Sequence, residues 1–258
     1  MDWNPKVLCW NVRGLNNPAK RNAVREFVVE AKVNLVCLQE MKLDVIDPFI
    51  ALQCLGPSYD GFAYLPASDT CGGILLGWDT TVLEVDNMAM DTHSLTGLVH
   101  IKEGSTWWVT VVYGPQGDDA KMQFLVELHN RGAICSGPWM VLRDFNMILR
   151  VDEKRNNNLN RRIMRRFKDF VDDCELKEPY MHGRRFTWSN EREQPVLTKI
   201  DRVLFSVDWD LTYSDVLLQA LSTNISNHTL LHLTNSAPFC VKKKFHFEMY
   251  WLKLDGFE

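Results

Sequence analysis

The sequence predicts an α/β fold in which strands and helices pack in layers. The 258-residue chain is 46% hydrophobic and 24% charged, an ordinary globular composition. Short runs rich in Val, Leu, Ile, Trp and Tyr recur along it, with helix-like segments between them. The length suffices for one large core or two small ones, but no Pro/Gly/Ser-rich linker and no internal repeat divides the chain. We therefore expect one layered domain.

The expected strands are short apolar runs that end at Gly, Asp or another polar residue. Their β-branched and aromatic content favours strand over helix. They are residues 7–12, 34–39, 62–65, 73–78, 82–87, 95–102, 106–113, 138–143, 201–206 and 229–233.

The expected helices have apolar residues at intervals of three and four, which gives each helix one buried face. The first begins at Asn16-Asn17-Pro18, a cap followed by an early proline. The expected core faces are Val24, Phe27, Val28 and Ala31 in residues 17–31, Met122, Leu125, Val126 and His129 in residues 119–131, and Ile163, Phe167, Phe170, Val171 and Cys174 in residues 160–174.

The stretch Val141-Leu-Arg-Asp-Phe-Asn146 is the most informative one for function. An apolar run ends at Asp144, and the alternation of a strand places Asp144 and Asn146 on the same face. A carboxylate beside an amide can hold a water molecule and a phosphate oxygen, as a phosphoester hydrolase requires. The same pattern also fits an Asp that only begins a turn, so the ends of the other strands decide its meaning.

Polar side chains also stand at the ends of several other expected strands. They are Asn11 in residues 7–14, Glu40 in residues 35–40, Tyr113 in residues 107–115, Asp201 in residues 199–206, and His228 in residues 226–228, just before the apolar Leu230–Leu233 run.

In order and spacing these motifs resemble the endonuclease/exonuclease/phosphatase superfamily, the group of DNase I and the apurinic endonucleases, across residues 6–235. The resemblance implies a four-layer α-β-β-α sandwich of two mixed, mostly antiparallel sheets, with the active site where strand ends meet at one edge. The family-like domain would span residues 1–238, and residues 239–258 would form a tail.

A narrower resemblance is to the endonuclease domain of plant LINE-type (non-LTR) retrotransposons. It rests on Gly183-Arg-Arg-Phe-Thr-Trp-Ser-Asn190, on Thr198-Lys-Ile-Asp-Arg-Val-Leu-Phe-Ser206 and on Phe245-His-Phe-Glu-Met-Tyr-Trp-Leu252. In such polyproteins a similar tail leads toward a reverse transcriptase. We therefore expect an isolated endonuclease domain, or a truncated or degenerate gene copy.

The resemblance implies Mg²⁺-dependent phosphodiester hydrolysis, with Mn²⁺ as the alternative ion. Glu40 would bind the metal, with Asn11 beside it and Asn227 on the same side of the site. Such a site needs only one or two carboxylates, because water completes the shell of Mg²⁺. The resemblance makes DNA the expected substrate, with RNA as the alternative.

The resemblance also implies a role for each of the other polar residues. Asp144 would orient or deprotonate the attacking water, and Asn146 and Tyr113 would contact the scissile phosphate. His228, held by Asp201 on its other ring nitrogen, would stabilise the developing negative charge.

Two positions depart from the family pattern. Asn227 stands where the family usually has Asp, which removes a negative charge from the metal side. Arg143 stands where Gly usually precedes the Asp-Phe-Asn motif, so a long cation would crowd the strand end or shift the strand. These departures leave open a weakened enzyme or a catalytically inactive nucleic-acid-binding domain. A phosphomonoesterase or inositol-phosphate phosphatase of the same fold is a further alternative.

The net charge of −4 gives no global attraction to nucleic acid, but residues 150–168 are locally basic. Arg161, Arg162, Arg165 and Arg166 in this stretch are the expected contacts to the phosphate backbone, and a solvated helix face is the alternative.

The seven cysteines are scattered without a CxxC pair, which fits a reducing compartment and argues against a zinc site. The sequence contains neither a signal-peptide pattern at residues 1–6 nor an apolar run long enough to span a membrane. We expect an intracellular monomer, nuclear or cytoplasmic, that is neither secreted nor bound to a membrane.

Overall fold

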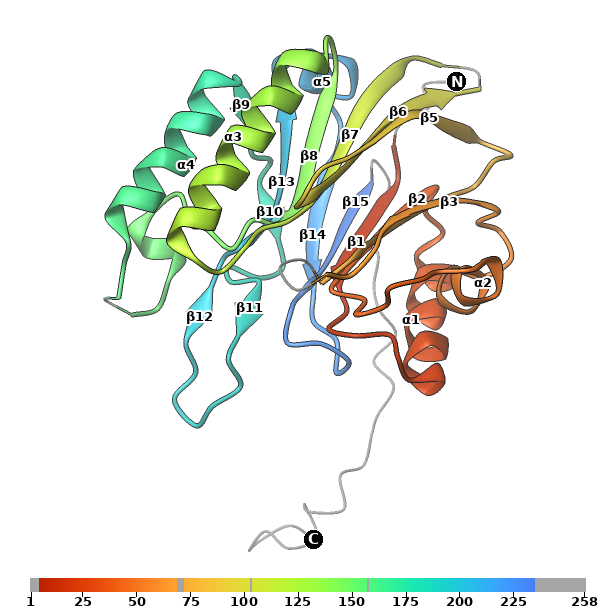
Figure 1. Ribbon diagram of the computed structural model, residues 1–258, viewed down its shortest axis with the longest axis horizontal. Coiled ribbons are helices and arrows are strands. Elements are labelled where there is room, and N and C mark those ends of the chain that lie inside the picture. Colours follow the sequence, from red (N-terminus) through yellow and green to blue (C-terminus); the bar gives the residue numbers. More distant parts are fainter. Residues whose placement is uncertain (1–4, 69–71, 103, 157, 235–258) are drawn as a thin grey trace, which may run out of the picture.

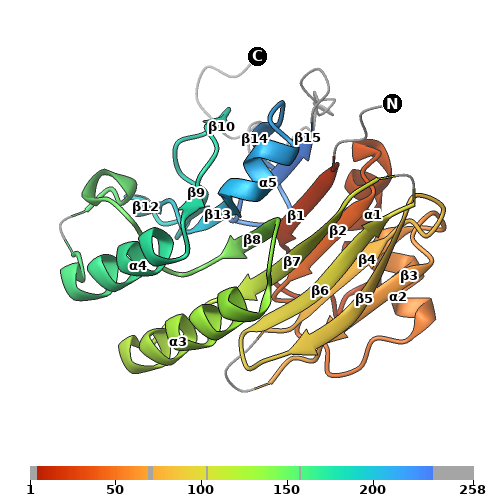
Figure 2. The same ribbon diagram turned by 90° about the horizontal axis from the view of Figure 1, so that it is seen from above.

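The fold is a sandwich of two sheets with helices on both outer faces (Figure 1). The computed structural model describes residues 5–68, 72–102, 104–156 and 158–234. Helices α1 (Pro18–Ala31) and α2 (Pro48–Leu55) cover one sheet, and α3 (Asp118–Ile134) and α4 (Arg161–Asp173) cover the other (Figure 2). The predicted four-layer sandwich is confirmed.

The first sheet has seven strands in the order β10-β14-β15-β1-β2-β4-β3. Within it, β1 pairs with β2 and β10 with β14 in parallel, whereas the other neighbours are antiparallel. Its strands are β1 (Val7–Asn11), β2 (Leu35–Gln39), β3 (Gly61–Leu65), β4 (Ile74–Trp78), β10 (Met181–His182), β14 (Leu217–Leu221) and β15 (Leu230–Thr234).

The second sheet has six strands in the order β5-β6-β7-β8-β13-β9, and only β7 and β8 are parallel. Its strands are β5 (Leu83–Met90), β6 (Ser94–Ile101), β7 (Thr106–Tyr113), β8 (Trp139–Asp144), β9 (Leu176–Lys177) and β13 (Asp201–Ser206). The remaining elements are the 3₁₀ turn η1 (Val151–Glu153), helix α5 (Val207–Thr212), and a ribbon of β11 (Trp188–Ser189) and β12 (Leu197–Thr198).

The core has one apolar layer between the sheets and one under each helix pair. In the layer between the sheets, Trp107 and Trp209 meet edge to face with ring centroids 6.1 Å apart. Asn17 and Asp47 cap α1 and α2 with their side chains, and each is followed by a proline; α1 begins where the sequence analysis predicted it.

Strand direction brings the polar strand ends to a single edge. Because β1 is parallel to β2, Asn11 lies beside Gln39, and because β7 is parallel to β8, Tyr113 lies beside Asp144. Strand β13 runs antiparallel to β8, which places its first residue, Asp201, directly opposite Asp144. The end of β8 thereby lies beside the start of β13.

The structure corrects part of the expected core. Helix α3 buries Phe124, Leu125 and Leu128, whereas Val126, predicted to be buried, is 59% exposed. The buried stripe is therefore shifted on the helix by one position. Helices α2 and α5 and strand β14 were not predicted, since each is too short for a periodic pattern to stand out. The tail at residues 239–258 lies outside the described residues, in which no helix is long and apolar enough to cross a bilayer.

Gly114 lies where two backbones meet below the site edge. A Cβ on Gly114 would lie 2.3 Å from the carbonyl oxygen of Phe145, which backbone pairing prevents from moving away. We expect Gly114→Ala to lower the free energy of unfolding by about 2 kcal/mol, as overpacking does. Gly117→Ala is the control, because a Cβ there meets nothing within 4 Å. Equal stabilities in urea titrations would contradict the prediction.

Candidate active site

The edge at which the strand ends meet holds a cavity of about 590 Å³. Seven of the predicted site positions either line this cavity or lie directly beneath it. Glu40, Tyr113, Asp144, Asn146, Asn227 and His228 line it, and Asp201 lies buried beneath with no exposed surface. Asn11 is also fully buried and reaches the site through Asp144.

Asp144 is held at the end of β8 by hydrogen bonds to each carboxylate oxygen. Asn11 Nδ2 donates to its Oδ2 at 3.1 Å, and the backbone amide of Asn146 donates to its Oδ1 at 3.0 Å. Burial, together with the nearby charge of Asp201, raises the pKa of Asp144 to about 6. A carboxylate that is fixed in place and has a pKa near neutral pH is suited to act as a general base.

His228 and Asp201 form a buried pair beneath the cavity. His228 Nδ1 lies 3.1 Å and 3.0 Å from the two carboxylate oxygens of Asp201, so this ring nitrogen carries the proton. Burial opposes the charged form of both groups. Even so, Arg143 and His228 lower the pKa of Asp201, and Asp201 raises the pKa of His228. The ring is thereby oriented and favoured as a cation, with Nε2 left free of this pairing.

The sequence led us to expect that Arg143 would crowd the strand end or shift the strand. Instead, its side chain lies fully buried and does not line the cavity. Its Nε donates to Gln39 Oε1 at 2.8 Å and its Nη1 to the carbonyl of Thr229 at 3.1 Å, which ties the two sheets together. Nη1 also lies 3.6 Å from Asp201 Oδ1. The backbone of Arg143 has a φ of +111°, a region that favours glycine, the residue that the family resemblance led us to expect at this position.

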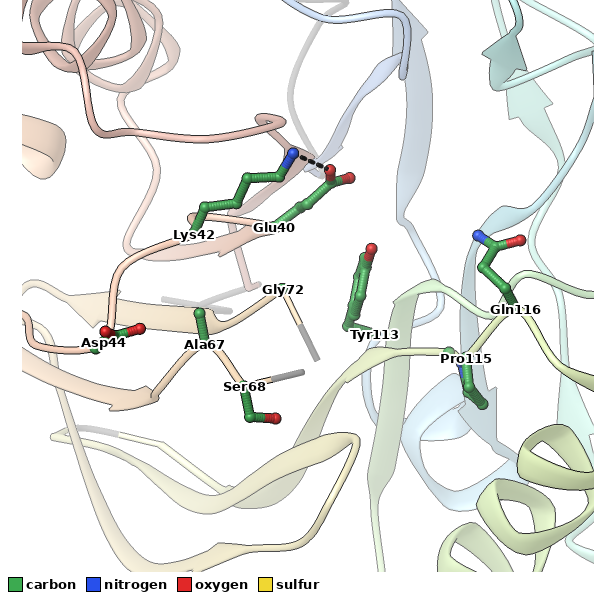
Figure 3. A pocket seen from close by; sticks show the side chains of 10 residues that line it. Glu40, Lys42, Asp44, Ala67, Ser68, Gly72, Tyr113, Pro115 and Gln116 are labelled. Carbon is green, nitrogen blue, oxygen red and sulfur yellow. Dashed lines mark ion pairs between the residues drawn. The ribbon is translucent and has the colours of Figure 1, made fainter. Parts of the chain in front are cut away.

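Glu40 and Asn227 supply the oxygen atoms on the expected metal side. The Glu40 side chain is 15% exposed, and its Oε1 lies 3.2 Å from Lys42 Nζ (Figure 3). Asn227 Nδ2 donates to the carbonyl of Ser189 at 2.7 Å, which leaves the buried Oδ1 without a hydrogen-bond partner among the described residues. A carboxylate and an unpaired carbonyl oxygen at one cavity fit a hard, hydrated divalent cation.

A second set of ligand-type atoms lies within 4.8 Å of one another in Asp144, Asp201 and His228. This set fits a metal less well, because His228 Nδ1 already contacts both oxygens of Asp201 and Asn11 occupies one oxygen of Asp144. Glu40, whose ion-pair partner is a half-exposed lysine, is the better ligand.

Asn146 and Tyr113 border the cavity on the side of the second sheet. Asn146 Nδ2 donates to the carbonyl of Gly114 at 2.5 Å, and its Oδ1 accepts from Gln116 Nε2 at 3.0 Å. The amide is therefore fixed by neighbours. Tyr113 lines the cavity from the last position of β7, beside Asp144.

The predicted arginine cluster lies outside the cavity. Arg161, Arg162, Arg165 and Arg166 are exposed on α4, and none of them is among the residues that line it. The cations that do line it are Arg13, Lys121, Lys154 and Arg192, which come from four separate segments. Lys154 lies in the predicted basic stretch 150–168, whereas the other three were not predicted as site residues. Trp188 and Asn190 of the Gly183–Asn190 segment also line the cavity.

The fold and this edge site define a class of phosphoesterases and nucleases built on two stacked sheets. The sequence profile of the Endonuclease/Exonuclease/phosphatase family matches residues 8–228, and the chain belongs to this family. A search among curated protein sequences finds no relative.

Solved structures share the fold at low sequence identity. The AP endonuclease LMAP of Leishmania major is 17% identical with a TM-score of 0.67, covering 89% of this chain and 86% of its own. The endonuclease domain of TRAS1, a telomere-specific non-LTR retrotransposon, is 10% identical with a TM-score of 0.63, covering 90% and 97%. ANGEL2, a 2',3'-cyclic phosphatase, is 13% identical with a TM-score of 0.59, covering 90% and 94%.

The buried guanidinium of Arg143 gives a testable stability effect. Arg143→Met would leave the Asp201 carboxylate without one of its two cations and Gln39 without its donor. We expect the free energy of unfolding to fall by about 3 kcal/mol, as when one partner of a buried ion pair is removed. The exposed Arg162→Met is the matched control. If Arg143→Met and the control have equal free energies of unfolding, the contacts of Arg143 between the two sheets do not contribute to stability.

Proposed function

We propose that this protein is a Mg²⁺-dependent phosphodiesterase that nicks DNA, of the non-LTR retrotransposon type. The observation that carries the proposal is the convergence of Asp144, His228 and Glu40 on one cavity, with Asp201 and Asn11 fixing the first two from beneath. Hydrolysis of a phosphodiester needs a base, a cation and a donor for the developing charge, and these residues supply all three.

In this proposal each residue acts from the position it occupies. Asp144, with its raised pKa, accepts the proton of the attacking water. His228, kept protonated by Asp201, donates toward the negative charge that develops on phosphate oxygens. Tyr113 and Asn146, which line the cavity beside Asp144, contact the same phosphate.

The metal side of the site is proposed from the Glu40 carboxylate, which is paired with Lys42, and from the unpaired Oδ1 of Asn227. Glu40 and Asn227 Oδ1 would hold Mg²⁺, or Mn²⁺ in its place, with water completing the shell. When bound, the ion supplies charge neutralisation for the phosphate and the leaving oxygen. Asn11 Nδ2 donates to Asp144, and its Oδ1 already accepts from the backbone amide of Arg13 at 3.2 Å, so we propose a positioning role for Asn11.

A nucleic-acid substrate is supported by the charges around the cavity. Arg13, Lys121, Lys154 and Arg192 come from different elements, yet all line it, as a path for a polyanion requires. Trp188, at the base of the β11–β12 ribbon, adds an aromatic surface to the wall. The ribbon projects from the site edge (Figure 1).

The retrotransposon type is supported by the plant LINE-like segment Gly183–Asn190, because Trp188 and Asn190 of that segment line the cavity. The TRAS1 endonuclease domain shares the fold over 90% of this chain. In a full-length protein of this type the domain would act beside a reverse transcriptase, and RNA would be the second substrate to test.

An inactive nucleic-acid-binding domain is the second candidate, favoured by the neutral Asn227 and by the ion pair that occupies Glu40. A phosphatase is the third, and it shares the fold with ANGEL2. Nicking of supercoiled plasmid with Mg²⁺ separates the first candidate from the second, and release of phosphate from monoesters tests the third.

Glu40→Gln should abolish metal-dependent nicking while leaving the fold intact. The substitution keeps the size of the side chain but removes the only carboxylate that we place on the metal side. Plasmid nicking with Mg²⁺ and with EDTA measures the effect, and Asp144→Asn serves as the chemically inactive reference. Nicking by Glu40→Gln at the parental rate would exclude Glu40 as the metal ligand.

Binding of duplex DNA should depend on salt through the cations near the site edge. Replacing Lys121 and Lys154 by Gln should reduce the slope of log K against log salt by about 0.9 for each phosphate that is no longer neutralised. Arg161, Arg162, Arg165 and Arg166, replaced together, test the α4 surface in the same way. The control replaces Lys32 and Lys102, exposed at the opposite strand ends. If replacing a set of residues changes the salt slope no more than replacing Lys32 and Lys102 does, that set does not contact the DNA backbone.

A further inference from the structure

We propose that Lys42 is a built-in counter-ion of Glu40 that competes with the divalent cation and is released to the substrate phosphate when the cation binds. The inference rests on the proposed function, because it takes Glu40 as the metal ligand. It adds a regulatory step to that site, in which metal binding is an exchange of one cation for another.

Lys42 already pairs with the Glu40 carboxylate, at the place where the divalent cation would bind. Lys42 Nζ lies 3.2 Å from Glu40 Oε1, within direct contact of a carboxylate that is only 15% exposed. The lysine side chain is 53% exposed, so its end can leave the carboxylate without breaking core packing. Figure 3 shows the ammonium against the Glu40 carboxylate in a cleft of about 630 Å³, which shares Glu40, Tyr113 and Gln116 with the site cavity.

The backbone presents Glu40 and Lys42 together. Both have left-handed conformations, with φ of +53° and +57°, and the fully buried Met41 anchors the turn between them. The amide of Gly14 donates to the carbonyl of Glu40 at 2.5 Å, and the amide of Lys42 donates to the carbonyl of Gly72 at 2.9 Å. Because these bonds fix the turn, the backbone positions of both residues are set, and only the rotamer entropy of the two side chains opposes the ion pair.

Several positively charged side chains lie near Glu40. Burial and the nearby Arg13 lower the pKa of Lys20, Glu40 opposes this, and Lys42 lowers it further, so these four groups share one electrostatic neighbourhood. Lys20 Nζ donates to the carbonyl of Arg13 at 3.1 Å, which holds it there. Glu40 therefore contacts one cation directly and shares its surroundings with two more, and an incoming divalent ion must displace or repel positive charge.

The same arrangement couples the metal to the substrate. An ammonium freed from Glu40 stays at the cleft wall, where it adds positive charge for a phosphate. A bound phosphate in turn favours the released lysine and so favours the metal at Glu40. By linkage the two ligands strengthen each other's binding, with Lys42 carrying part of the coupling.

The test measures binding of Mn²⁺ by electron paramagnetic resonance at low salt, which is a readout independent of catalysis. Lys42→Gln should bind Mn²⁺ about fivefold more tightly than the parent, since a screened, half-exposed charge is worth about 1 kcal/mol. Lys42→Arg, which keeps the charge, should bind as weakly as the parent. Lys102→Gln, an equal charge change at the far strand ends, should leave the affinity unchanged.

Equal or weaker Mn²⁺ binding by Lys42→Gln would overturn the proposal, provided thermal unfolding shows an intact fold. Binding that tightens equally in Lys102→Gln would also overturn it, because net charge alone would then explain the effect. Glu40→Gln separates the two levels of inference. If it binds Mn²⁺ like the parent, the metal assignment of the proposed function fails; if it loses binding while Lys42→Gln is unchanged, only the role of Lys42 fails.

The coupling gives a second measurement. A non-cleavable phosphorothioate oligonucleotide should tighten Mn²⁺ binding to the parent by about threefold more than to Lys42→Gln, because only the parent has a lysine to exchange. Identical tightening in the two proteins would show that Lys42 does not carry the coupling.

Discussion

Two buried carboxylates face each other across adjacent antiparallel strands, and the rest of the site is arranged around this repulsion. Asp144 and Asp201 are register partners on β8 and β13; Asp144 is only 1% exposed where it borders the cavity, and Asp201 has no exposed surface. Like charges in this position are destabilising unless cations offset them. Arg143 from behind and His228 from the cavity supply those cations, and the two carboxyls consequently separate in character. The one beside both cations has a lowered pKa, while the other has a raised one.

The same contacts also join the two sheets, so the site is part of the joint between them. Asn11 on the first sheet donates to Asp144 on the second, and Arg143 on the second donates to Gln39 on the first. A shift of one sheet against the other would break both bonds. Interfaces of this kind hold reacting groups to the accuracy that catalysis needs, because the sheets themselves are rigid supports. Stability and function are therefore drawn from one set of buried polar contacts.

The sequence predicts the strands and the polar residues at their ends, because strand ends leave a local trace, whereas the four layers were predicted from the family resemblance. Asp144 and His228 each border an apolar run, and this pattern is visible without knowing how the strands pair. The sequence does not show which way the Arg143 side chain points. A long side chain at a strand end can point to either face of its sheet, and only the position of the partner sheet decides between them. The cations at Lys121 and Arg192 were missed because the fold alone brings these separate segments together.

The predicted roles on the metal side depend on charge more than on shape. Asn227 keeps the size of an aspartate and has a buried Oδ1 without a hydrogen-bond partner among the described residues, but it cannot offset the cations near Glu40. In the proposed site, one carboxylate, one amide oxygen and a competing lysine would hold a free divalent ion weakly. A bound phosphate would strengthen the binding, since it brings the missing negative charge itself. In such a site the substrate completes the metal-binding set, and a neutral residue at position 227 becomes compatible with activity on a polyanion.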